Sequence, residues 1–210
     1  MINSKFYNYF WIFMFGSVLG VASESLWRLV TRGIFVTRVG VIYGPFNPVY
    51  GIGLVLITIC LINFSDRNIL FVIFIGALLG GFFEYFTSVA QQTIFGTISW
   101  DYNKFSYNIN GRVNIPYTIF WGLIGAIWIK VFYPSIKDLI SKIPRNPGVF
   151  ITYLLLLFMI LDISISTAAV YRESERYLNI PPQNYAEIFL DTHYPDDFLH
   201  KIYPNMKKTY

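Results

Sequence analysis

Charged residues are scarce in this 210-residue chain. They make up 13% of it, whereas a soluble domain carries about a quarter. Hydrophobic residues make up 55%, and the mean hydropathy is +0.49. This balance excludes an ordinary soluble domain and predicts an integral membrane protein, which we expect to be a multi-pass protein of the cell membrane.

Other absences narrow the chemistry. The single cysteine, Cys60, excludes an intrachain disulfide. The two histidines, His193 and His200, fit no spacing of metal ligands, so neither a metal nor a cofactor is expected. No Gly-x-x-x-x-Gly-Lys motif is present, which excludes ATP hydrolysis by that route. The net charge of +4 is spread over loops and tail, which favours membrane lipids as partners and argues against nucleic acid.

Five apolar stretches are long enough to cross a hydrocarbon core of ~30 Å at ~1.5 Å per residue. They cover residues 6–27, 48–64, 69–94, 115–133 and 148–170. Residues 134–147 carry apolar side chains at helical spacing, which predicts a short amphipathic helix lying in the membrane interface. We therefore predict an all-α polytopic helix bundle, with residues 1–170 as the transmembrane domain and residues 171–210 as a polar C-terminal tail that packs on the loops.

A repeated pattern links the first and third spans. Glycines four residues apart precede an acid by four more, as Gly16, Gly20 and Glu24 and again, at an offset of 60, as Gly76, Gly80 and Glu84. A weaker match relates residues 44–48 to residues 111–116, at an offset of 67. The pattern predicts two parallel helix–loop–helix repeats, although a match of this length also arises by chance in an apolar chain.

Three acids, Glu24, Glu84 and Asp162, fall inside apolar spans, where a charged group is expensive. All three are expected in the half of the bundle that also holds the first and third loops. Two interpretations stay open: the acids line a functional cavity, or they form structural ion pairs between helix ends.

The loop after the third span combines interfacial aromatic residues, amides and a cation. Trp100 suits the headgroup level, and Arg112 suits a carboxylate or a phosphate. The alternative is an ordinary turn with an interfacial arginine. The predicted substrate-binding residues are Glu24, Arg28, Arg32, Glu84, Ser88, Trp100, Asp101, Asn108, Asn110, Arg112 and Asp162.

The chain also resembles a known family. The residues that carry the resemblance are Glu84-Tyr-Phe-Thr-Ser88, Trp100-Asp-Tyr102, Asn108-Ile-Asn-Gly-Arg112, Arg32-Gly33, residues 44–51, Asp162 with Arg172, and residues 194–197 and 203–206. On these segments it resembles the CmpB-like ABC-transporter type IV family. The resemblance implies a bacterial membrane protein with its ATPase on a separate chain, and it supplies no established catalytic residues.

Three functions are compatible with these observations. The first is a permease-like subunit that binds a small-molecule or lipid substrate in a polar cavity. The second is an intramembrane enzyme acting on a lipid or lipid-linked substrate, with Glu84 or Asp101 as general acid or base and Arg112 holding an anionic headgroup. The third is a non-catalytic membrane assembly partner.

Overall fold

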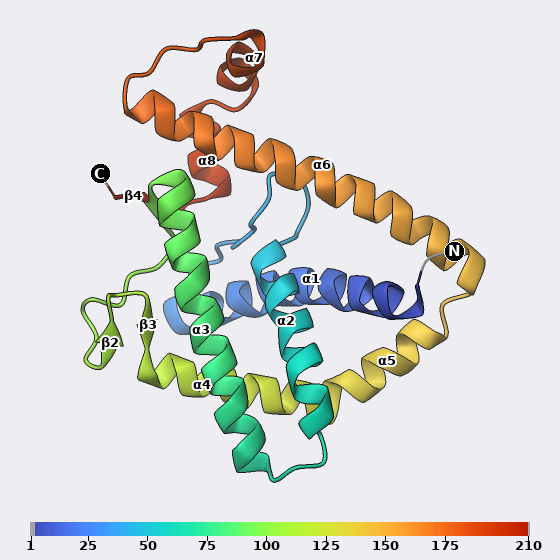
Figure 1. The fold of residues 1–210 in the computed structure, drawn as a ribbon. Coiled ribbons are helices and arrows are strands. Elements are labelled where there is room, and N and C mark those ends of the chain that lie inside the picture. The colour runs from blue at the N-terminus through green and yellow to red at the C-terminus, as the bar shows by residue number, and fades with distance from the viewer. Residues whose placement is uncertain (1–2, 210) are drawn as a thin grey trace.

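The structure is a computed structural model that describes residues 3–209, apart from the side chain of Arg32 (Figure 1). It is mostly helical, with almost no sheet, and it confirms the all-α bundle. Its helices are α1 (Ser4–Arg32), α2 (Pro48–Leu61), α3 (Ile69–Phe95), α4 (Ile115–Ile127), α5 (Tyr133–Ser141), α6 (Arg145–Tyr177), α7 (Tyr185–His193) and α8 (Asp196–Ile202). Four two-residue strands form two antiparallel pairs: β1 (Thr97–Ile98) with β4 (Lys207–Lys208), and β2 (Asn108–Ile109) with β3 (Val113–Asn114).

Four of the helical stretches are long and apolar enough to cross a membrane, on length and composition: Ser4–Thr31, Ile69–Phe95, Ile115–Ser141 and Arg145–Tyr177. A fifth apolar stretch, Pro48–Phe64, is shorter and consists of α2 and a 3₁₀ turn, η1 (Ile62–Phe64). These five stretches match the five predicted spans in order.

Asparagines set the starts of the second and third spans. Asn47 and Asn68 accept hydrogen bonds from the backbone N–H groups of Val49 and Leu70, which would otherwise lack partners. Pro48 follows Asn47 at the first helical position, where the missing N–H costs nothing. At its C-terminal end α3 is capped by Gly96, whose left-handed backbone (φ 58°) glycine adopts without strain.

The predicted interfacial helix at 134–147 differs from the observed one in its boundaries. α5 is continuous with α4 through a π-helical turn, η2 (Trp128–Phe132), and it ends at Ser141. Pro147 does not interrupt α6, because it lies in the first turn of that helix, where backbone N–H groups have no intrahelical partner. α6 therefore begins earlier than predicted and also continues past residue 170.

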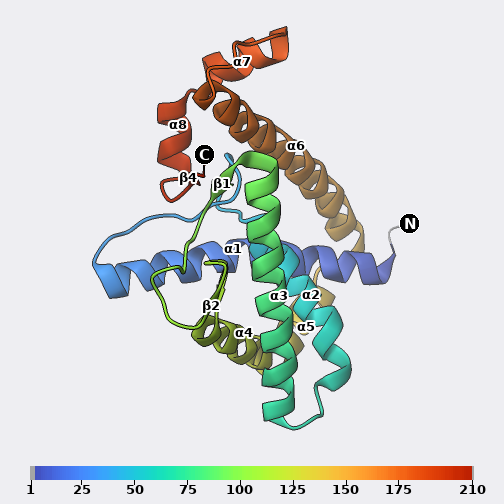
Figure 2. The ribbon, with the colours of Figure 1, turned by 60° about the vertical axis from the view of Figure 1, so that its left-hand side comes forward.

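The bundle is built from two helical pairs. α1 packs along α2 and α3 packs along α4, and these are the most extensive contacts between helices. In both views α1 runs at a steep angle to α3, and α6 flanks the pairs, with α7 and α8 near its C-terminal end (Figures 1 and 2). The main apolar core lies between the pairs and includes Ile12, Leu61, Val72, Trp128 and Ile140.

Candidate functional site

The two helices of each pair are joined by the same kind of three-residue contact. A glycine on the first helix lies against an aromatic side chain of the second, and the polar atom of that side chain reaches an acid one turn further along the first helix. In α1 and α2 the three residues are Gly20, Tyr50 and Glu24; in α3 and α4 they are Gly80, Trp121 and Glu84. The first helices correspond at an offset of 60, as the sequence pattern predicts, whereas the second helices correspond at 71 (Tyr50 to Trp121).

The glycines are needed because the aromatic residue occupies the space that a side chain would fill. A Cβ atom on Gly80 would meet Cγ of Trp121 at 3.0 Å and Cβ of Trp121 at a still shorter distance. A Cβ atom on Gly20 would overlap the ring of Tyr50 in the same way. Small residues of this kind allow close helix approach in lipid.

Both carboxylate oxygens of Glu84 have donors. The Tyr102 hydroxyl donates to Oε1 at 2.8 Å, and the Trp121 indole N–H donates to Oε2 at 3.1 Å. Burial and the neighbouring Glu84 raise the pKa of the Tyr102 hydroxyl far above its usual range, so this loop residue keeps its proton and remains a donor. Glu84 itself is 8% exposed, so it joins α3, α4 and the loop between them.

Glu24 has a cationic partner. Arg38, from the loop between α1 and α2, approaches Glu24 at 2.6 Å, and the Tyr50 hydroxyl donates to the same carboxylate. Arg38 also donates to the carbonyl of Ser99 at 3.3 Å, which connects the first loop to the third. Arg28 lies half-buried one turn after Glu24, and the side chain of Arg32 lies outside the described part of the structure.

A cavity of about 280 Å³ lies where the C-terminal part of α3 meets the following loop. Five predicted residues line it: Ser88, Trp100, Asp101, Asn110 and Arg112. Five further lining residues were not predicted from the sequence: Gln92, Ile98, Asn103, Gly111 and Thr209. Gln92 follows Ser88 by four residues on α3 and could have been found from that helical spacing. Thr209 could not, because β4 brings it there by pairing with β1.

Arg112 is held at the cavity by neutral groups. Its guanidinium donates to the Ser88 hydroxyl at 3.0 Å and to the side-chain oxygen of Gln92, and it lies 5.9 Å from the centre of the Tyr85 ring. Within residues 3–209, no carboxylate oxygen lies within 4.0 Å of it. The cavity therefore contains a cation whose charge no carboxylate of the described residues neutralises at contact distance.

The loop that carries Arg112 is shaped by its amides. Asn110 and Gly111 both have positive φ, 54° and 66°, which Asn and Gly tolerate best. The Asn108 side chain accepts from the backbone N–H of Gly111 at 2.8 Å, and the Trp100 indole N–H donates to the Arg112 carbonyl at 2.9 Å. Asn108 therefore supports the turn, while Asn110 lines the cavity.

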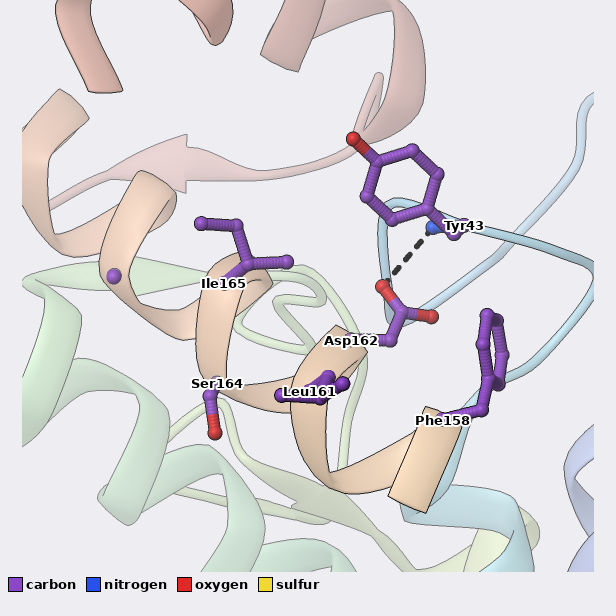
Figure 3. Close-up of a pocket in the computed structure, with 7 residues that line it drawn as sticks. Tyr43, Phe158, Leu161, Asp162, Ser164 and Ile165 are labelled. Atoms are coloured by element: carbon purple, nitrogen blue, oxygen red, sulfur yellow. Dashed lines mark hydrogen bonds between the residues drawn. The ribbon is translucent and has the colours of Figure 1, made fainter. Parts of the chain in front are cut away.

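Asp162 lies at a different place. It is 2% exposed on α6 and lines a second pocket, of about 450 Å³, together with Tyr43 from the first loop (Figure 3). The structure thus places the predicted residues at a cavity around Arg112 and a pocket at Asp162, while two of the acids, the half-buried Glu24 and the buried Glu84, line neither. Among the described residues, no group of three or more His, Cys, Asp or Glu side chains could hold a metal ion.

Comparison with known families assigns the chain. The model of the family described as "Putative ABC-transporter type IV" matches residues 11–167. The chain belongs to this family. No curated protein and no solved structure matches it.

Membership in the type IV family and the four long apolar helices together support a membrane component of an ABC-type transporter. The matched region of this type IV member contains the glycine contacts, the Arg112 cavity and Asp162, but it ends before Thr209. Thr209, which follows β4, therefore contributes to the cavity from outside the matched region.

Proposed function

We propose that this chain is the permease-like subunit of an ABC-type transporter in the cell membrane, crosses that membrane several times, and binds an anionic group of its solute or lipid substrate at the Arg112 cavity. The observation that carries the proposal is the guanidinium of Arg112, which is fixed by Ser88 and Gln92 and has no carboxylate partner among the described residues. A guanidinium held in this way can donate to a phosphate or carboxylate through charge-assisted hydrogen bonds.

The rest of the cavity suits the same ligand. The side-chain amides of Asn103 and Asn110 provide neutral donors, and the aromatic face of Trp100 provides an apolar wall. Asp101 is the one acid among the lining residues, and it accepts a hydrogen bond from the backbone N–H of Asn103 at 2.9 Å. Because the sequence contains no phosphate-binding loop of the Gly-x-x-x-x-Gly-Lys kind, ATP hydrolysis is assigned to a separate subunit.

Binding tests the anion site directly. Protein purified from nanodiscs that contain equal amounts of phosphatidylglycerol and phosphatidylcholine is analysed by native mass spectrometry, with inorganic phosphate as a soluble competitor. We expect Arg112→Gln to weaken retention of the anionic lipid, or of phosphate, by about tenfold, the loss of one charge-assisted hydrogen bond. Lys104→Gln makes the same charge change on an exposed residue that does not line the cavity, and it should leave retention unchanged. If both variants retain the anionic lipid or phosphate equally, the proposed anion site at Arg112 is refuted.

Transport tests the permease assignment. The chain and an ATPase subunit that cross-links to it in membranes are reconstituted together, and uptake of phosphate- or carboxylate-bearing solutes is followed with and without ATP. ATP-dependent uptake that Arg112→Gln abolishes and Lys104→Gln preserves is the expected result. A failure to find either an ATPase partner or any flux would refute the assignment.

A lipid-modifying enzyme is the second candidate, because Asp101 and Arg112 line the same cavity. Asp101 would act as general acid or base while Arg112 binds the headgroup. Product formed from a lipid in the absence of any ATPase, and lost in Asp101→Asn, would favour this candidate over the permease.

A further inference from the structure

The pocket at Asp162 has apolar walls and a single acid at its base. Phe158, Leu161 and Ile165 project from one side of α6, and Tyr43 from the first loop closes the other side (Figure 3). Leu161 is 61% exposed and Phe158 is 37% exposed. The pocket is therefore open along an exposed apolar face of α6, as an alkyl chain would require.

The acid is held in place through one of its two oxygens. Oδ1 of Asp162 accepts from the backbone N–H of Tyr43 at 3.1 Å and from the Ser166 hydroxyl at 3.2 Å. Ser166 is fixed in turn by the backbone N–H of Ile42, which donates to its oxygen at 2.8 Å. These contacts orient the carboxyl group without using Oδ2.

Oδ2 of Asp162 is buried and has no hydrogen-bond partner within residues 3–209. Figure 3 shows this oxygen turned toward Phe158, away from the bond to Tyr43. No Lys, Arg or His in the described part of the chain forms an ion pair with Asp162. A buried acceptor left in this state is costly, and a donor that also carries positive charge would remove both the unmet hydrogen bond and the unpaired charge.

We propose that this pocket binds the primary ammonium group of an amphiphile, with a membrane aminophospholipid as its source. The ammonium N–H donates to Oδ2 of Asp162, and the alkyl chains lie along Phe158, Leu161 and Ile165. A quaternary ammonium cannot fill this role, because it has no N–H to donate. This site lies apart from the Arg112 cavity and does not depend on its function.

The experiment measures which lipid stays bound. Wild-type protein in nanodiscs of phosphatidylethanolamine, phosphatidylcholine and phosphatidylglycerol in equal parts is transferred to mild detergent, and bound lipids are counted by native mass spectrometry. We expect preferential retention of phosphatidylethanolamine, reduced by about tenfold or more in Asp162→Asn, which keeps an oxygen for Tyr43 and Ser166 but loses the charge. Ala168, one turn beyond Ser164, also lines the pocket, and Ala168→Leu, which fills the pocket and leaves the acid intact, should reduce retention as well.

Two controls distinguish this site from the other buried acids and from a site for soluble amines. Glu84→Gln removes a buried acid whose two oxygens already have donors, and it should leave retention unchanged. Displacement of the lipid by dodecylammonium but not by butylammonium supports a lipid source, whereas displacement by both supports the same ammonium site filled by a soluble amine. Equal retention of phosphatidylcholine and phosphatidylethanolamine, or unchanged retention in a folded Asp162→Asn protein, would overturn the proposal.

Discussion

The contact between Gly80 and Trp121 predicts that a single added methyl group will separate α3 from α4. In Gly80→Ala the new Cβ atom would lie within 3.0 Å of Trp121 Cγ and closer still to its Cβ, distances at which one of the two helices must move. Because the indole N–H also donates to Glu84, displacement of Trp121 removes one of the two donors of a buried carboxylate.

The magnitude follows from three contributions. Overpacking a well-filled interior costs about 1–3 kcal/mol. Loss of a hydrogen bond to a charged group costs about 1.5–3 kcal/mol. The higher helix propensity of alanine relative to glycine stabilises the folded protein by about 1 kcal/mol. We therefore expect the free energy of unfolding to fall by about 1.5–5 kcal/mol in Gly80→Ala.

The matched control is Gly125→Ala, on α4 in the same helical pair. Its Cβ atom would closely approach only the end of the Leu61 side chain, at 3.3 Å, so a shift of that methyl group by a few tenths of an ångström accommodates it, whereas Gly80→Ala requires the backbone-proximal Cβ of Trp121 to move. Unfolding of the purified proteins in mixed detergent micelles, titrated with sodium dodecyl sulfate, measures both. A Gly80→Ala protein within about 0.5 kcal/mol of Gly125→Ala would refute the argument, since experimental error covers that interval.

Two further predictions concern individual donors and acids. Trp121→Phe keeps an aromatic ring in the contact but removes the N–H, so the same titration should show a loss of about 1.5–3 kcal/mol, and a value near zero would mean that Glu84 does not need this donor. In the tail, hydrogen bonds from Arg172 hold the pKa of Asp191 below its usual range, and Arg176 adds to the effect. A depressed pKa contributes stability that is present above the unfolded value and is lost as the pH falls through the folded one. The protection of the α7 amides against hydrogen exchange, measured relative to their intrinsic exchange rates, should therefore fall on acidification below about pH 4. Asp191→Asn should remove that acid dependence, and an unchanged profile would contradict the assignment.

The sequence predicts the apolar architecture well, because the signals for it are local. The starts at residues 48, 69 and 115 coincide with the observed ones, since Asn47-Pro48, Asn68 and Asn114 precede apolar runs. α6 extends beyond the predicted apolar span 148–170 at both ends, because hydropathy does not register that Pro147 is tolerated in the first turn of a helix or that Arg172 forms ion pairs with Glu175 and Asp191.

The candidate site is less accessible to sequence reasoning. Tyr50 and Trp121 read as ordinary apolar residues in their spans, and only the register between two helices reveals that they donate to Glu24 and Glu84. Asp162 was grouped with the other acids because it falls in the same half of the bundle. Its separate position depends on the fold of the first loop, which places the backbone N–H of Tyr43 against it.

The pairing of β1 with β4 has a consequence for how the protein is made. Thr209 completes a cavity whose other lining residues are synthesised about a hundred residues earlier, and its backbone N–H donates to the Gly96 carbonyl at 2.9 Å. During translation, both helical pairs can enter the bilayer while this cavity still lacks one side. The Arg112 cavity therefore acquires its last lining residue only after Thr209 has left the ribosome.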